Sequence, residues 1–254
     1  MTSEYQKKQA FLKQVISVYG RKPVLEVLED FSLDVHKLHL ADSNKPSKAI
    51  DDLVKLANAR NVEIAYHSKQ ALSRISKNGK QDQGVVVDVL NQKQLDLSQS
   101  DLAGKVYIGL DNVTNPQNVG MIIRSAAAAG VDGIIIPVNG NAALGPLVIK
   151  SSAGTLFKAP ILRCDSSEDM IERCQQHNIR CVALAGEGTT DVFQTFSSAQ
   201  PTLYIVGNET DGIDTHIKSR CDLLAKINMN NGVESLNVAV AASVVAFGAV
   251  NHVR

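Results

Sequence analysis

Hydrophobic and polar residues change their spacing several times along the first part of the chain, and the changes predict a small α/β domain. Apolar residues recur at helical spacing as far as Tyr19, which predicts a leading helix or arm that covers residues 1–18 and ends near residue 20. Residues 19–90 then switch between helical and strand-like spacing. The predicted helices lie around residues 24–28 and 46–60, and the predicted strands cover residues 35–40, 62–66 and 84–89.

A second α/β domain is predicted over residues 105–254. Residues 91–104 are polar and lack a strong period, and we expect them to form a linker. After the linker, short apolar runs alternate with helical segments, which is typical of a mainly parallel sheet covered on both faces. Ligands of such sheets usually bind beyond the carboxyl ends of the strands. The predicted strands cover residues 106–110, 133–137, 181–185, 203–206 and 224–228.

The last predicted helix begins at Ser235, a natural N-cap residue, and runs to about residue 250. It is apolar nearly all round. A helix of this kind in a globular protein is either buried inside the molecule or covered by a partner. We therefore expect a subunit interface here, with internal burial as the alternative.

Composition narrows the class of protein more than the function. The chain has 254 residues, 44% of them apolar, with 26 basic and 26 acidic residues, so a sizeable core is possible and no basic excess is present overall. Residues 1–100 hold 15 Lys and Arg against 12 Asp and Glu, which places any electrostatic attraction for nucleic acid in the first half. No membrane span or signal peptide is expected, and the four cysteines lack metal-type spacing. We expect reduced thiols in a cytoplasmic protein without a metal.

Candidate chemistry is concentrated in four segments of the second domain, each rich in small or polar residues. Together they supply an Arg, a Glu, two Asn and a Ser, with glycines that let a ligand approach the backbone. That combination is typical of a catalytic pocket. The segments are NPQNVGMIIRSA at residues 115–126, SSAG at 151–154, GNETDG at 207–212 and NGVESLNV at 231–238.

Arg124 stands out in the first of these segments. It lies in a largely apolar helix predicted to run from an N-cap at Asn118 to Gly130, and a charge there is costly unless it is paired or reaches a ligand. Gly120, one turn earlier, leaves space on the same face. Arg124 therefore either forms a structural ion pair, extends to solvent, or binds a ligand.

The other candidates also have more than one interpretation each. Glu209 follows a strand end, where it pairs with Arg124, holds a substrate group, or simply lies near a helix start. Ser235 caps a helix or contacts a ligand. The GEG at residues 186–188 is no dinucleotide fingerprint, because Asp191 occupies the third glycine position.

The order, spacing and identity of these segments resemble the SpoU-type RNA ribose 2′-O-methyltransferases, and most of all their 23S ribosomal RNA guanosine branch. The resemblance covers residues 19–252, and residues 19–28 and 83–86 look like the ends of the family's ribosomal-protein-like RNA-binding domain. It implies a small N-terminal α/β substrate-binding domain and a C-terminal α/β trefoil-knot methyltransferase domain. It also implies dimerisation through the C-terminal domain, and S-adenosylmethionine as the cofactor.

The resemblance assigns roles to individual residues. The methyl donor would contact Gly207, Ile227 and Leu236, largely through backbone atoms. The catalytic positions would be Asn118, Arg124, Glu209, Ser235 and Asn237. Thr210 departs from the family, which commonly has Gly after the Glu, and its side chain would narrow the pocket or shift that loop.

Arg124 has two possible roles in the chemistry. The family's usual assignment makes the Arg a base, but a guanidinium with a pKa above about 12 rarely loses its proton. The alternative is that Arg124 holds the neighbouring phosphate and stabilises the developing alkoxide.

The expected function is methylation of a ribose 2′-hydroxyl in structured RNA, with ribosomal RNA favoured over transfer RNA because a separate N-terminal domain suits a shaped element. A non-catalytic RNA-binding protein on the same scaffold is an alternative. An α/β enzyme that acts on a small molecule is another, and it would need no RNA-binding domain.

Overall fold

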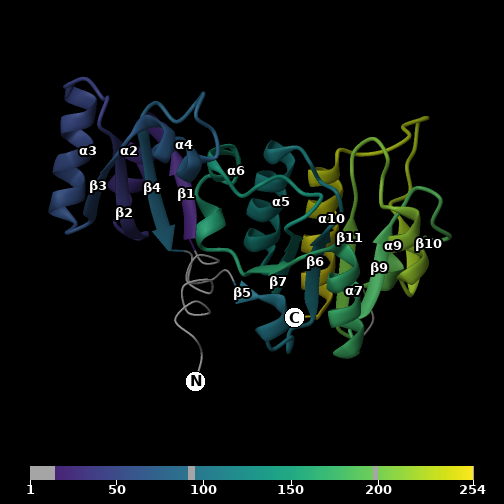
Figure 1. The fold of residues 1–254 in the computed structure, drawn as a ribbon. Coiled ribbons are helices and arrows are strands. Elements are labelled where there is room, and N and C mark those ends of the chain that lie inside the picture. The colour runs from purple at the N-terminus through teal and green to yellow at the C-terminus, as the bar shows by residue number, and fades with distance from the viewer. Residues whose placement is uncertain (1–14, 91–94, 197–199, 254) are drawn as a thin grey trace. The chain divides into compact units, whose positions relative to one another are not determined.

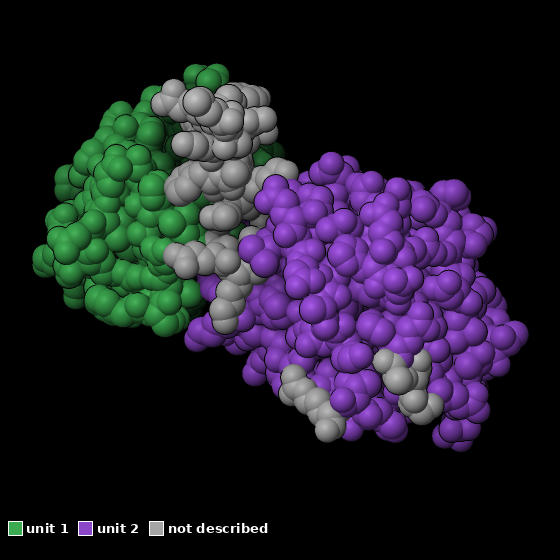
Figure 2. Space-filling view, turned by 90° about the horizontal axis from the view of Figure 1, so that it is seen from below, with its two compact units in different colours: residues 1–92 green, residues 93–254 purple. Residues whose placement is uncertain are grey.

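The structure is a computed structural model that describes residues 15–90, 95–196 and 200–253. It divides the chain into two compact units, Met1–Gln92 and Lys93–Arg254, which Figure 1 shows as ribbons and Figure 2 in two colours. Each unit has its own sheet. Among the described residues, no helix is long and apolar enough to cross a membrane.

The first unit is a four-stranded sheet with helices on both faces. The strands lie in the order β1-β4-β2-β3, and β4 runs antiparallel to its neighbours β1 and β2, while β2 and β3 are parallel. Its elements are β1 (Val15–Tyr19), α2 (Arg21–Glu29), β2 (Asp34–Ala41), α3 (Lys48–Ala59), β3 (Glu63–His67), α4 (Lys69–Ser76) and β4 (Val85–Leu90). The predicted helices and strands of residues 24–89 are confirmed, and α4 was not predicted.

The end of the predicted leading helix is wrong, because Val15–Tyr19 forms strand β1. Its side chains alternate between buried and half-buried, with Ile16 and Val18 in the core. Apolar residues at positions 15, 16 and 19 fit a helical stripe as well as a strand, and pairing with β4 decides between them. Residues 1–14 of that prediction lie outside the described residues.

The second unit is an eight-stranded sheet in the order β10-β12-β9-β11-β6-β7-β8-β5, and every pairing in it is parallel. The predicted parallel sheet is therefore confirmed, although β5, β8 and β10 were not predicted. Its strands are β5 (Leu95–Asp96), β6 (Val106–Leu110), β7 (Gly133–Pro137), β8 (Ile161–Cys164), β9 (Arg180–Leu184), β10 (Thr190–Asp191), β11 (Thr202–Val206) and β12 (Leu223–Lys226). Its helices are η1 (Leu97–Gln99), α5 (Pro116–Ala129), α6 (Pro146–Ser151), η2 (Thr155–Phe157), α7 (Ser167–Gln176), α8 (Val192–Thr195), α9 (Thr215–Arg220) and α10 (Val238–Val253).

Both faces of this sheet are covered. On β11, Leu203 and Ile205 belong to one core cluster with Met170 of α7. Tyr204, between them, points to the other face, where its ring meets Phe196 edge-on at 5.8 Å between centroids. On that face α10 packs against α5 and against β6 and β11, and Figure 1 shows the two helices side by side. The apolar strands are thus buried on both sides, as the continuous apolar pattern predicts.

The linker predicted over residues 91–104 is wrong from residue 95 onward. Leu95–Asp96 pairs with β8 as a short strand. Leu97 and Leu102 are only 1% and 5% exposed, and both belong to the core of the second unit. Three leucines in a polar stretch were too few to give a period. Residues 91–94 lie outside the described residues.

Candidate active site

Two asparagines cap the helices that frame the candidate site, and neither cap is the predicted one. The N-cap of α5 is Asn115, whose Oδ1 accepts from the Gln117 N–H at 2.9 Å, so the prediction of Asn118 is wrong. Helix α10 begins at Val238, and Oδ1 of Asn237 accepts from the Ala239 N–H at 2.9 Å, so Ser235 is not its cap. The side chain of Asn118 is therefore available for contacts other than capping.

Asn118 joins two of the predicted catalytic residues. Its amide is buried, with the residue 5% exposed, and its Nδ2 donates a hydrogen bond to Oε1 of Glu209. Its Oδ1 accepts from Nδ2 of Asn237 at 3.2 Å. The structure thus connects the start of α5, the loop after β11 and the start of α10 through one side chain. We call Asn118, Glu209 and Asn237 the amide–carboxylate cluster.

The loop that carries Glu209 is tightly closed. Asn208 and Gly212 exchange backbone hydrogen bonds at 2.9 and 3.0 Å. A Cβ on Gly207 would lie 2.3 Å from the Gly212 carbonyl carbon, so no side chain fits at position 207. The left-handed position of the loop is Gly212, with φ of 69°. Gly207 is therefore required by the loop's own packing, and the closed loop fixes where Glu209 points.

Thr210 fits this loop without strain. Its N–H is held by Oδ1 of Asn208 at 2.8 Å, its side chain is exposed, and its φ is not positive. A glycine is not needed there, because the residue with the left-handed backbone is Gly212. The predicted shift of the loop therefore has no cause in the backbone at residue 210.

Two of the three predicted donor-binding residues, Gly207 and Ile227, lie at one edge of the sheet. Strands β12, β9 and β11 are neighbours and parallel, so their carboxyl ends meet at this edge. Gly207 directly follows β11 and Ile227 directly follows β12, which places them roughly 10 Å apart across β9. Gly186, two residues beyond β9, has nothing within 4 Å of where a Cβ would be. Leu236 lies in the segment before α10 and is 36% exposed.

Arg124 lies apart from the amide–carboxylate cluster. Six residues separate it from Asn118 on α5, which corresponds to about 9 Å along the helix axis and about 120° around it. The side chain is exposed, and no carboxylate of the described residues is within ion-pair distance of it. Of the interpretations of Glu209, the pairing with Arg124 is wrong, because Glu209 accepts from Asn118 instead. Arg124 is thus an exposed cation available to a ligand.

The space that was predicted beside Gly120 is filled by another helix. A Cβ at Gly120 would lie 1.9 Å from Oγ of Ser151 and 2.7 Å from the carbonyl oxygen of Val148. Oγ of Ser151 donates to the Leu147 carbonyl at 2.7 Å. Gly120 and the start of the 151–154 segment therefore serve the close packing of α6 on α5. Ser235 is exposed in the segment before α10.

Sequence reasoning missed Asp111, whose carboxylate holds the backbone just after the loop that carries Glu209. It follows β6 directly and is almost fully buried. Oδ1 accepts from the Ser167 hydroxyl at 2.7 Å, and Oδ2 accepts from the Asp214 N–H at 2.9 Å. The next residue, Asn112, accepts from Nδ2 of Asn208 through its carbonyl at 3.0 Å. An Asp-Asn pair directly after an apolar strand was the available signal.

Lys218 of α9 and Glu187 of the segment after β9 form an ion pair. Nζ of Lys218 donates to Oε1 of Glu187 at 2.6 Å, and this hydrogen bond lowers the pKa of Glu187. Within the described ranges, no group of three or more His, Cys, Asp or Glu side chains is arranged to hold a metal ion. The arrangement offers amide and carboxylate groups, an exposed guanidinium and open backbone.

Comparison with known proteins gives this arrangement a context. Residues 105–247 match the model of the SpoU rRNA Methylase family, and residues 17–94 match a domain described as RNA 2′-O ribose methyltransferase substrate binding. A 23S rRNA (guanosine-2′-O-)-methyltransferase RlmB from Xylella fastidiosa is 31% identical over 241 residues, which is 92% of this chain and 96% of that one.

Solved structures are similar over almost the whole length. An AdoMet-bound rRNA methyltransferase from Sinorhizobium meliloti has a TM-score of 0.67 and 25% identity, with 97% of this chain and 91% of that chain covered. The SpoU methyltransferase AviRb from Streptomyces viridochromogenes, in complex with AdoMet, has a TM-score of 0.65 and 26% identity, with 98% and 93% covered. Both parts of the chain thus match, in order, and the chain belongs to the SpoU rRNA methylase family.

Proposed function

We propose that the chain transfers a methyl group from S-adenosylmethionine to a ribose 2′-hydroxyl in structured RNA, with ribosomal RNA in the cytoplasm as the substrate. The amide–carboxylate cluster beside the end of β11 is the observation that carries the proposal. The family membership and the relatives' names support it.

The residues at the sheet edge fit the donor. Gly186 leaves open space beside the backbone, and Gly207 holds the closed loop at the neighbouring strand end. Ile227 and Leu236 are apolar and only partly covered, which suits an adenine ring. When bound, S-adenosylmethionine supplies an electrophilic methyl group on a sulfonium. The chain's own task is to align the ribose oxygen with that methyl group.

The remaining residues divide this task. The amide–carboxylate cluster has its hydrogen bonds made before substrate arrives, so it presents Glu209 in a fixed position without reorganisation. We assign to Arg124 the phosphate next to the target ribose and the negative charge that develops on its oxygen. Ser235, exposed at the same helix start as Asn237, is assigned a substrate contact.

Two finer features are part of the proposal. After β12, residues 227–237 carry the chain back past β9 and β11 so that α10 packs on α5 and β6, and this return supports a trefoil knot.

On α10, Val240 and Phe247 are 48% and 45% exposed, and Val244 between them is partly exposed, at helical spacing. This apolar stripe supports a homodimer through the second unit, which sedimentation velocity of the full chain tests.

The deciding experiment is tritium transfer from labelled S-adenosylmethionine into bulk RNA from cells that lack the protein, followed by nuclease mapping. We expect one labelled 2′-O-methyl nucleotide in ribosomal RNA. A label confined to transfer RNA would replace the substrate class and keep the reaction. If neither a label nor donor binding by calorimetry is found, the chain is a non-catalytic RNA-binding protein on the same scaffold.

A further inference from the structure

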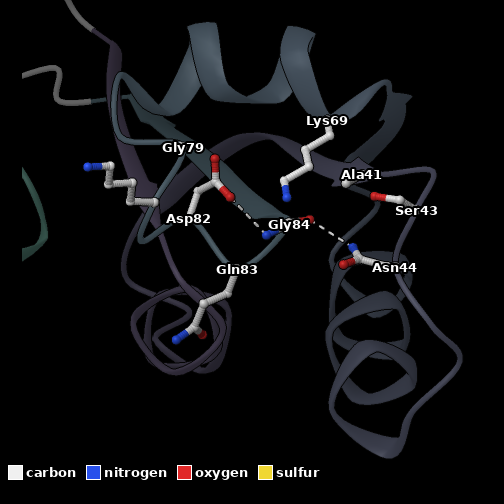
Figure 3. A pocket seen from close by; sticks show the side chains of 9 residues that line it. Ala41, Ser43, Asn44, Lys69, Gly79, Asp82, Gln83 and Gly84 are labelled. Carbon is white, nitrogen blue, oxygen red and sulfur yellow. Dashed lines mark hydrogen bonds between the residues drawn. The ribbon is translucent and has the colours of Figure 1, made fainter.

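A polar pocket lies in the first unit, which contains none of the candidate catalytic residues. Its volume is about 250 Å³, and Figure 3 shows it from close by. Ser43 and Asn44 come from the segment after β2, Lys69 is the first residue of α4, and Lys80 and Gln83 come from the segment before β4. We call these five residues the lysine pocket.

The pocket occupies the edge of the sheet where ligands of parallel strands usually bind. Strands β2 and β3 are parallel, and β4 is antiparallel to both β1 and β2, so β1, β2 and β3 run the same way. Their carboxyl ends and the amino end of β4 meet at one edge. The segments that leave β2 and enter β4 line the pocket there. This is the position that open α/β sheets use for binding.

Positive charge is concentrated in the two segments around the pocket. Residues 42–48 and 68–84 contain six of the eleven Lys and Arg of residues 15–90, but only two of the ten Asp and Glu. One of the two acids, Asp82, also lines the pocket, but it is buried, and its carboxylate accepts from the Gly84 N–H at 3.0 Å and from the Ser76 hydroxyl at 3.0 Å. The six basic residues are Lys45, Lys48, Lys69, Arg74, Lys77 and Lys80.

The two lysines of the pocket are available to a ligand. Neither Lys69 nor Lys80 forms an ion pair with a carboxylate of the described residues. Figure 3 shows the ammonium group of Lys69 extending over the pocket toward Gly84. The unpaired ammonium group of Lys69 over the pocket attracts an anion, and phosphate is the anion that lysine binds as a point charge.

The walls of the pocket are already in place. Nδ2 of Asn44 donates to the Gly84 carbonyl at 2.8 Å, and a Cβ on Gly84 would lie 2.2 Å from Oδ1 of Asn44. Gly84 has φ of 75° and Gln83 has φ of 53°, so two successive residues adopt the left-handed conformation. Oε1 of Gln83 accepts from the Arg21 N–H at 3.1 Å. A ligand therefore meets a formed site and does not have to order it.

We propose that the lysine pocket binds one unpaired nucleotide of the RNA substrate, with its phosphate on Lys69 and with Lys80 adding positive charge at the edge of the pocket. The inference rests on the proposed function, because it takes the methylated RNA as the ligand. The volume lies just below the roughly 300–1,000 Å³ of small-molecule pockets, so it suits a single nucleotide. RNA bases become accessible to such pockets in loops and bulges, where they are unstacked.

The test uses the full-length chain with Lys69→Gln and Lys80→Gln, and with Lys55→Gln as the matched control. Lys55 is an exposed lysine on α3 of the same unit, and it does not line the pocket. The probe is ribosomal RNA from cells that lack the protein. Filter binding at several salt concentrations gives RNA affinity, steady-state methylation gives kcat and KM, and calorimetry gives donor affinity.

Each pocket variant should weaken RNA binding about three- to tenfold, raise the KM for RNA by a similar factor, and lower the salt slope by about one. The kcat and the donor affinity should not change, and Lys55→Gln should bind within about twofold of wild type. Irradiation of RNA that contains 4-thiouridine should cross-link an unpaired uridine to residues 41–48 or 77–84.

Equal effects of Lys69→Gln and Lys55→Gln would overturn the proposal, as would cross-links from these segments only to base-paired uridines. Failure of the proposed function would give a different result from failure of the pocket proposal. In that case wild-type protein transfers no methyl group to any RNA, while the binding comparison between variants still reports on the pocket.

Discussion

At the scale of single residues, Arg124 carries the sharpest prediction. Its guanidinium is exposed and makes no ion pair with a described residue, so its removal should leave the fold intact. We expect Arg124→Ala to lower single-turnover methyl transfer by at least about 100-fold, because it removes the charge that we assign to the developing oxyanion. Arg124→Lys should fail as well, since an ammonium lacks the planar fork.

Donor affinity by calorimetry distinguishes this role from a structural one. Both variants should bind S-adenosylmethionine as tightly as wild type, because Gly207 and Ile227 lie at strand ends and Arg124 lies on α5. A loss of donor affinity equal to the loss of rate would contradict the assignment.

Two hydrogen-bonded histidines, buried His39 and half-buried His67, predict how the first unit responds to acid. Nδ1 of His39 lies 2.9 Å from Nε2 of His67, and Nε2 of His39 lies 3.1 Å from Oδ2 of Asp88. Burial, followed by the charge on His39, lowers the pKa of His67. The folded state therefore takes up a proton less readily than the unfolded chain, whose histidines titrate near about pH 6.5.

The sign of the effect follows from linkage. The contribution of His67 to stability is complete above about pH 6.5 and is lost as the pH falls from there toward its lower folded pKa. We expect the Tm of the first unit to fall between about pH 7 and pH 5, and His67→Gln to flatten that fall, because Gln keeps a hydrogen bond without the proton. Calorimetric scans at several pH values measure it. Identical slopes for wild type and His67→Gln would count against it.

At the scale of elements, the contact between α5 and α6 gives a stability prediction. A Cβ at Gly120 would lie 1.9 Å from Oγ of Ser151 and 2.7 Å from the Val148 carbonyl oxygen, and the second contact is backbone. We expect Gly120→Ala to reduce the free energy of unfolding by about 1–3 kcal/mol, as overpacking does. Urea unfolding measures the change.

Gly145→Ala provides the matched control for this prediction. Gly145 precedes α6 with φ of −115°, and the nearest atom to an added Cβ is 3.8 Å away. Its replacement should change the free energy of unfolding by less than about 0.5 kcal/mol. Equal stability of both variants would show that α6 moves away from α5 without cost.

Helices and strands could be predicted from the sequence where the regular spacing of apolar residues extends over enough positions. The helices α2 and α3 and the strands β6, β7 and β11 lie where the pattern of apolar residues predicts them. Helix starts were harder, because Asn115 and Asn118, or Ser235 and Asn237, are equally good caps by residue type. Only the packing of each helix decides which residue ends up at its first turn. The space beside Gly120 was likewise assigned to a ligand, because the sequence does not show that α6 packs there.

At the scale of the whole molecule, the candidate site consists of segments far apart in the sequence. Asn118 and Glu209 are 91 residues apart, and Asn118 and Asn237 are 119 apart, yet their side chains are hydrogen-bonded. Nothing in local periodicity reports such a distance, so only the resemblance to a family grouped them beforehand. The lysine pocket was missed because its two segments are ordinary loops by composition, and only the sheet brings them together.

The boundary between the two units predicts the relative stability of two shortened chains. The sequence pattern favours a linker over residues 91–104, but Leu97 is 1% exposed in the core of the second unit, and β5 pairs with β8. A chain that begins at Lys93 should therefore be more stable than one that begins at Asp101, by at least about 2 kcal/mol, the usual cost of losing a buried leucine. Urea unfolding of both chains, with full-length Leu97→Ala as the control, measures the difference.

The chain that begins at Lys93 also separates the two parts of the proposed function. It retains the sheet edge with Gly207 and Ile227, so it should bind S-adenosylmethionine with nearly full affinity. It lacks the unit that matches the substrate-binding domain, so methyl transfer to ribosomal RNA should fall sharply through KM. Undiminished transfer to RNA would mean that the second unit recognises its substrate alone. Activity on a small molecule, unaffected by the deletion, would favour an enzyme that has no need of RNA.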